Sequence, residues 1–142
     1  MKGMRTEEIL LDDGYRSIYF YDDAGVHRRT TDYDSSGNVT FDIHYEIDEL
    51  KRVIGWRVFD SSGNRLKIFE VDYGSHGLET ERREYGASGE LDSVHRLIYN
   101  KNDLLIEEQT LDSNRQIRTR TRFSPNGGML SVEHYDAQGR PV

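Results

Sequence analysis

The sequence predicts an all-β protein, an antiparallel meander of about ten or eleven strands joined by tight hairpins. Three observations support this fold class. One turn-like motif recurs along the chain at a fixed spacing, the segments between its copies alternate apolar and polar residues, and little room is left for helices. The sheet is expected to twist and curl, and a closed barrel, a sandwich and an open curved sheet remain alternatives.

The recurring motif is an aromatic residue or leucine, a polar residue that is usually aspartate, two variable residues and, most often, glycine. Its ten copies begin at Tyr21, Tyr33, Tyr45, Phe59, Tyr73, Tyr85, Tyr99, Leu111, Phe123 and Tyr135, always 12 or 14 residues apart. Glycine occupies the fourth following position at Gly25, Gly37, Gly63, Gly77, Gly89, Gly127 and Gly139. This placement predicts a three-residue hairpin loop, in which a type I turn ends in a left-handed residue with a G1 bulge.

Three copies lack the glycine and carry Glu49, Asp103 or Arg115 in its place. In two of them an asparagine, Asn102 or Asn114, lies one residue earlier and could adopt the left-handed conformation if the turn shifts by one.

The segments between the turns read as half-buried strands. Residues 39–45, for example, alternate strictly between apolar and polar side chains. The hairpin predicts that the residue six places after each turn aromatic pairs with it across the strands. The apolar residues Val39, Leu91, Leu105, Ile117 and Met129 fit this register, whereas His27, Lys51, Arg65 and Glu79 do not. The aromatics are expected to mark the core face of the sheet.

The repeat units of 12 and of 14 residues differ in the polarity of the sheet face opposite the turn aromatics. A 12-residue unit such as residues 116–123 is polar there, whereas the 14-residue units are apolar on both faces. The apolar residues opposite the aromatics are Ile54, Trp56, Val58, Leu66, Ile68, Val94, Ile98, Leu104 and Ile106. Strands with two apolar faces are either covered by curling of the sheet or expose a patch that binds a partner.

Composition predicts a single all-β domain over residues 1–142. The formal net charge of −7 disfavours nucleic acid or an anionic membrane as a partner and is compatible with a basic protein. There is no cysteine, so no disulfide or thiolate chemistry is available. Residues 1–14 do not resemble a secretory signal and no stretch could span a bilayer, so a cytoplasmic protein is expected.

No catalytic, cofactor or metal motif is recognisable, and a non-enzyme without cofactor is expected. The five histidines, His27, His44, His76, His95 and His134, lack the short spacing of metal ligands. Residues 32–37 partly imitate a calcium loop, but Ile43 stands where the bidentate glutamate belongs. A hairpin turn explains the same residues, with Asp34 bonded to its own backbone.

Arginines alternate along one segment at Arg118, Arg120 and Arg122. An anion or RNA stripe is one interpretation. A ladder of cross-strand ion pairs with Glu107, Glu108 and Glu133 is the favoured one, because the chain is acidic. The pair Arg82 and Arg83, set among Glu79, Glu81 and Glu84, has the same interpretation.

Three copies of the turn, residues 33–38, 59–65 and 135–140, resemble the YD repeats of the RHS family, and the resemblance extends over residues 21–140. In that family long arrays of such hairpins spiral into a hollow shell around a polymorphic toxin. Ten short units are too few to enclose another folded domain. The resemblance therefore implies a small stand-alone repeat protein of the kind encoded beside polymorphic toxins, where an immunity protein is needed.

The leading functional hypothesis is a non-catalytic protein that binds and neutralises a cognate bacterial toxin, such as a basic nuclease or another effector. Its predicted contacts are an apolar centre of Trp56, Ile54, Val58, Leu66 and Ile68 with an acidic rim of Asp42, Glu70 and Asp72. Trp56 as a core residue is the alternative. A structural or assembly module, a fragment of an RHS-like β-shell and a carbohydrate-binding protein are the other functions considered, and the oligomeric state is left open.

Overall fold

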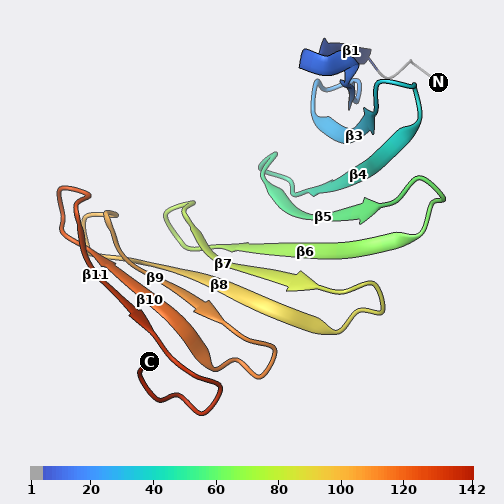
Figure 1. Ribbon diagram of the computed structural model, residues 1–142. Helices are drawn as coiled ribbons and strands as arrows, with labels where there is room; N and C mark the ends of the chain where they lie inside the picture. Colours follow the sequence, from blue (N-terminus) through green and yellow to red (C-terminus); the bar gives the residue numbers. More distant parts are fainter. Residues whose placement is uncertain (1–4) are drawn as a thin grey trace. The chain divides into compact units, whose positions relative to one another are not determined.

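The computed structural model of the chain describes residues 5–142, which are built almost entirely of β-strands (Figure 1). A short 3-10 helix, η1 (Asp12–Gly14), is the single helical element of this range. The strands are β1 (Arg5–Leu10), β2 (Arg16–Tyr21), β3 (His27–Tyr33), β4 (Val39–Ile47), β5 (Val53–Phe59), β6 (Arg65–Tyr73), β7 (Glu79–Tyr85), β8 (Leu91–Tyr99), β9 (Leu105–Leu111), β10 (Ile117–Phe123) and β11 (Met129–His134).

The 11 strands form one antiparallel meander whose order follows the chain from β1 to β11. The predicted fold class is thereby confirmed. The strand order has two ends, β1 and β11, and is therefore not the cyclic order of a barrel.

The hairpin turns have the predicted conformation, as the turn at Asp60 shows. The amide of Gly63 donates to the Asp60 carbonyl at 3.1 Å, and the Asp60 amide donates to the Asn64 carbonyl at 2.9 Å. Gly63 is left-handed, with φ of 82°. The Asp60 carboxylate accepts hydrogen bonds from the amides of Ser62 and Asn64, both at 2.9 Å. The aspartate thus satisfies the loop amides and the glycine supplies the left-handed residue.

The three turns without glycine adopt the same conformation with a strained residue. Lys51, Asp103 and Arg115 have φ of 63°, 61° and 61°. The predicted shift onto Asn102 or Asn114 is wrong, because Asp103 and Arg115 themselves occupy the left-handed position. The copy assigned to Tyr45 is also misplaced: Lys51 donates to the Asp48 carbonyl, so this turn follows Ile47.

The predicted cross-strand pairs are present. Val39, Leu91, Leu105, Ile117 and Met129 each pair with the turn residue six places earlier. Directly after each of these five residues, the strand has one residue without a partner in the preceding strand, which is a β-bulge. Thr40 is such a residue, because Tyr33 pairs with Val39 and Asp32 pairs with Phe41.

The bulges change the expected distribution of aromatics over the two faces. In β2 to β5 the register places Tyr21 on the face of Ile43 and Val58, whereas Phe59 lies on the opposite face with Asp42. The expectation that all turn aromatics mark one core face is therefore wrong. The extra residue of each bulge shifts the strict alternation by one position.

The chain divides into two compact units, Met1–Phe69 and Glu70–Val142, and the division falls within β6. In the described part of the first unit, the buried side chains are polar: Ser17, Thr30 and Thr31. The second unit buries Val71, Val94, Leu111 and Gln109. Because so few apolar side chains are buried, many others remain at the surface of each unit.

Candidate functional site

Trp56, the centre of the predicted binding surface, is half-buried in a row of rings on one face of the first unit. Its indole stacks on Phe69 of β6, with ring centroids 4.7 Å and planes 18° apart. Tyr45 of β4 lies 6.5 Å from Trp56 and 4.8 Å from His27 of β3. These ring contacts stabilise the sheet and leave part of the indole accessible.

Two tyrosines of β2 complete the row. Tyr19 meets the His27 ring edge-on at 5.1 Å, and Tyr21 lies 5.4 Å from it. Sequence reasoning missed this row, because its members come together only through the registers of four successive hairpins. The motif predicts a turn at Tyr45, but this residue lies in β4.

The other predicted apolar contacts do not all lie beside Trp56. Val58, two residues away on β5, shares its face. Ile68 precedes Phe69 on β6 and therefore lies on the face opposite the ring that stacks on Trp56. Ile54 and Leu66 are each 37% exposed. The structure thus distributes the predicted apolar centre over more than one face.

Asp42 lies on the face opposite Trp56, because it pairs with Phe59 while its neighbour Ile43 pairs with Val58. Its carboxylate accepts hydrogen bonds from Arg29 at 2.7 and 2.9 Å and from the Thr31 hydroxyl at 3.0 Å. Burial raises the pKa of Asp42, but these bonds and a contact with His44 outweigh it and hold the pKa below its usual range. Asp42 therefore anchors an ionic cluster.

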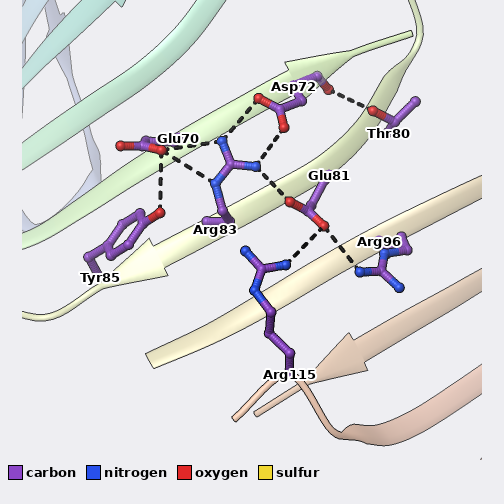
Figure 2. Close-up of polar contacts among 8 residues, drawn as sticks. All are labelled: Glu70, Asp72, Thr80, Glu81, Arg83, Tyr85, Arg96 and Arg115. Atoms are coloured by element: carbon purple, nitrogen blue, oxygen red, sulfur yellow. Dashed lines mark hydrogen bonds and ion pairs between the residues drawn. The ribbon is translucent and has the colours of Figure 1, made fainter. Parts of the chain in front are cut away.

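Glu70 and Asp72 belong to the second unit, where they surround Arg83 of β7 (Figure 2). The Arg83 guanidinium donates to Asp72 at 2.6 and 3.0 Å, to Glu81 at 2.6 Å and to Glu70 at 3.2 and 3.3 Å. The Arg83 side chain is only 13% exposed. The three carboxylates thus enclose one cation.

Two further arginines extend this network through Glu81 (Figure 2). Arg96 of β8 lies 3.3 Å and Arg115 3.7 Å from the Glu81 carboxylate. Hydrogen bonding to Asp72, opposed by burial and assisted by Glu81 and Glu70, raises the pKa of Arg83. The same contact lowers the pKa of Asp72. About half of the Glu70 and Asp72 side chains remains exposed, so both present charge to solvent.

The arginines of β10 form the predicted ladder of ion pairs. Arg122 bridges Glu107 at 3.2 Å and Glu133 at 3.3 Å, and Arg120 lies 3.4 Å from Glu107. Glu108 is not part of the ladder, because it pairs with Thr121 on the other face.

Of the other predicted arginine contacts, that of Arg82 is present and that of Arg118 is not. Arg118 is the bulge residue of β10 and bonds the Tyr135 carbonyl at 3.0 Å instead of joining the ladder. Arg82 pairs with Glu79 at 2.9 Å, as expected. Bulges therefore decide which arginines reach their predicted partners.

Residues 5–142 contain no group of three or more histidine, cysteine, aspartate or glutamate side chains arranged to hold a metal ion. At the partial calcium motif, the Asp34 carboxylate accepts hydrogen bonds from the amides of Ser36 and Asn38 at 2.9 and 3.0 Å. The turn interpretation of this motif is thus confirmed. Over the same described range, no helix has the length and apolar character needed to cross a membrane.

An apolar hollow in the first unit was missed from the sequence. It has a volume of about 280 Å³ and is lined by Leu11 and Tyr15 on either side of η1 and by residues of β2, β3 and β4, including Phe41. All three side chains are exposed. Two polar residues also line it, and the buried Ser17 hydroxyl donates to Asp32 at 2.6 Å. Leu11 and Tyr15 flank η1, outside the repeat motif, and this is why the repeat gave no signal for the hollow.

Comparisons with known proteins show similarity of fold. No protein-family model and no curated protein matches the chain. The structure of a Photorhabdus luminescens Tc holotoxin pore with a mutation in TccC3 is similar to 93% of this chain, with a TM-score of 0.61 and 17% identity. A crystal structure of TcdB2-TccC3-Cdc42 covers 91% of the chain at 14% identity, but its TM-score of 0.34 is too low to support a shared fold.

This chain spans a small part of both matched chains, 6% of the first and 9% of the second. The first match shows that the hairpin meander also occurs within a chain of a toxin complex. It concerns the fold alone.

Proposed function

We propose that this protein is a non-catalytic binding protein that neutralises a bacterial toxin by binding to it in the cytoplasm. The observation that supports the proposal most is the fold, which recurs in a chain of a Tc holotoxin. Its resemblance to YD repeats points to the same setting, in which a toxin requires a neutralising partner.

The surface of the described residues suits a protein partner. Exposed apolar side chains such as Leu10, Leu11 and Phe41 lie on a chain whose formal net charge is −7. Apolar anchors within a charged surround are usual at protein interfaces, and an acidic surface raises the association rate with a basic protein. A nuclease or another basic effector has the complementary charge.

The experiment is co-expression with a candidate toxin, sought in the reading frame beside this gene. Cells that carry the candidate alone are expected to die, and cells that also carry this protein are expected to grow, with the two proteins purifying together. Death in both strains, or growth without a complex, would refute neutralisation by binding.

A second candidate function is a structural module of a larger β-shell. The coverage of the Tc match favours it, since nearly all of this chain is similar to a small part of a much longer one. The two functions differ in their genetic setting: an adjacent toxin favours immunity, and continuation of YD repeats in the neighbouring frame favours a shell.

The predicted carbohydrate-binding alternative receives less support. The ring row of Tyr45, Trp56 and Phe69 is internally stacked, so packing already accounts for these aromatics.

A further inference from the structure

A side-chain oxygen inside the loop is a recurring feature of the hairpin turns. In six turns the carboxylate of an aspartate accepts hydrogen bonds from the amides two and four residues later, at 2.9 to 3.0 Å. These residues are Asp22, Asp34, Asp48, Asp60, Asp112 and Asp136. Asn100 accepts the corresponding pair through its carboxamide oxygen, at 2.9 and 3.1 Å. The two loop amides of such a turn thus converge on one oxygen atom.

Two other turns obtain this oxygen from elsewhere in the loop. In the turn at Ser124, the side chain of Asn126 accepts a hydrogen bond from the Gly128 amide at 3.1 Å. In the turn at Gly86, a Cβ added to the glycine would collide with the Glu90 carboxylate. Hydrogen bonds from the Ser88 hydroxyl and from the amides of Glu90 and Ser88 outweigh burial and lower the pKa of Glu90. Glutamate thus replaces the aspartate of the other turns.

The turn at Gly74 has the same backbone but, among residues 5–142, no such oxygen. The Gly77 amide donates to the Gly74 carbonyl at 3.0 Å, and the Gly74 amide donates to the Leu78 carbonyl at 2.8 Å. The amides of His76 and Leu78 occupy the two positions that converge on the carboxylate in an aspartate turn. Neither amide bonds to a side-chain oxygen of the described residues. Two donors therefore point to a common place at which this part of the chain provides no acceptor.

A cavity of about 350 Å³ opens at this turn, within the second unit. Gly74, His76 and Leu78 line it from the turn, and Leu97 and Ile98 of β8 provide an apolar wall. The volume lies within the range of small-ligand pockets. Apolar walls with a few convergent polar groups are typical of such pockets.

The amide pair favours an ionised oxygen, as the turn at Asp60 shows. A hydrogen bond from the Asn64 amide, opposed by burial and assisted by the Ser62 amide, lowers the pKa of Asp60. Asp103 is the carboxylate among the residues that line the cavity, and its ion pair with His76 at 2.6 Å offsets its charge. A carboxylate is therefore the group that best matches the two donors at Gly74.

We propose that the cavity at Gly74 binds a small organic acid. The carboxylate of the ligand accepts hydrogen bonds from the amides of His76 and Leu78, in the place that an aspartate carboxylate takes in other turns. The apolar part of the ligand contacts Leu97 and Ile98. This assignment concerns a small ligand and does not depend on the proposed neutralisation of a toxin.

The test uses the full chain, with phenylacetate as the probe and phenylacetamide as its neutral counterpart. In an NMR titration, phenylacetate is expected to shift the amide signals of His76 and Leu78 to saturation. Phenylacetamide is expected to bind about tenfold more weakly, because hydrogen bonds to a charged acceptor are stronger than those to a neutral one. Equal binding of the two probes, or no saturable shift at these amides, would overturn the assignment.

The variant Gly74→Asp supplies the carboxylate from the chain itself. Gly74 lies outside the left-handed region, so its backbone accepts a side chain, and an added Cβ lies 3.1 Å from the Thr80 methyl group. The variant is expected to bind phenylacetate at least about tenfold more weakly than the wild type does. Hydrogen exchange at the amides of His76 and Leu78 is expected to be slower in the variant, because its own carboxylate engages them.

The matched control is Gly74→Ala, which adds the same Cβ without a carboxylate. It is expected to bind phenylacetate as the wild type does, and circular dichroism verifies that both variants fold. Undiminished binding by folded Gly74→Asp, or an equal loss of binding in both variants, would refute the amide pair as the binding group.

Discussion

At the scale of single residues, the left-handed turn position shows how strongly this fold depends on glycine. Seven copies of the motif carry glycine there, and Lys51, Asp103 and Arg115 adopt the same conformation despite the clash of their Cβ atoms. At Lys51 the surrounding hydrogen bonds, from Leu50 and Arg52 to the Asp48 carboxylate, hold the turn in place.

Replacing Lys51 with glycine is therefore expected to stabilise the protein, by about 1 kcal/mol, because relief of the left-handed strain exceeds the added chain entropy. Urea unfolding measures the change. The matched control is Gly63→Ala, which has open space around the added Cβ and is expected to lose about the same amount through its φ of 82°. A destabilised Lys51→Gly variant would contradict this explanation of the turns.

His76 and Asp103 connect two turns of the second unit at 2.6 Å. The hydrogen bond that the His76 ring donates to the Asp103 carboxylate, together with the charge of Asp103, raises the pKa of His76. The contact therefore stabilises the fold below the ordinary histidine pKa of about 6.5 and is lost as pH rises through the raised value. Asp103→Asn is expected to return the NMR-titrated pKa of His76 to the ordinary range. An unchanged titration would show that the two side chains do not interact in solution.

At the scale of elements, strands β6 and β7 are joined by the cluster around Arg83. Replacing Arg83 with methionine leaves Glu70, Asp72 and Glu81 close together without their shared cation. We expect the free energy of unfolding to fall by about 2 kcal/mol, which is the size typical of hydrogen bonds to charged groups. Arg82→Met is the control, because Arg82 is 43% exposed and pairs with Glu79 at the surface. The free energy of unfolding of Arg82→Met is expected to fall by less than about 1 kcal/mol.

The stability lost in Arg83→Met is expected to depend on pH through the titration of Asp72. Arg83 lowers the pKa of Asp72, so their contact stabilises the fold above the unfolded aspartate pKa of about 4 and is lost as pH falls through the lowered value. The difference in unfolding free energy between the wild type and Arg83→Met is therefore expected to shrink below about pH 4. A difference that stays constant into acid would assign the loss to packing.

The elements also show how far the sequence could predict this structure. Aspartate and glycine fix the turns chemically, so strand order and hairpin pairs such as Tyr33 with Val39 were predictable. The turn after Ile47 was misplaced because it contains neither an aromatic nor a glycine. The faces were mistaken because each bulge inserts one residue, which a strict alternation of apolar and polar positions does not include.

The same limits apply to the candidate site. The apolar residues of the 14-residue units were identified with burial and exposure as alternatives, and the structure shows both, since Val94 is buried and Ile54 and Leu66 are exposed. Asp42 and Ile68 lie on the face away from Trp56. Such placement depends on registers accumulated over several strands. The hollow at Leu11, Tyr15 and Phe41 needs contacts outside the repeat, which periodicity does not describe.

At the scale of the whole molecule, the net charge of −7 bears on recognition more than on folding. Long-range attraction speeds association with a basic partner and is screened by salt. The association rate with the candidate toxin is therefore expected to fall by at least about tenfold as salt rises from low to physiological concentration, with a smaller change in the dissociation rate. Stopped-flow fluorescence measures both rates. A rate independent of salt would assign recognition to the apolar side chains alone.

We propose that this hairpin meander acts by binding another protein. The most direct test is light scattering of the purified protein mixed with the purified product of the neighbouring reading frame, with the toxin's activity assayed in the same mixture. A stable complex of defined stoichiometry, in which the toxin is inactive, is expected. Molar masses of two separate proteins and a fully active toxin would refute binding as the mode of action.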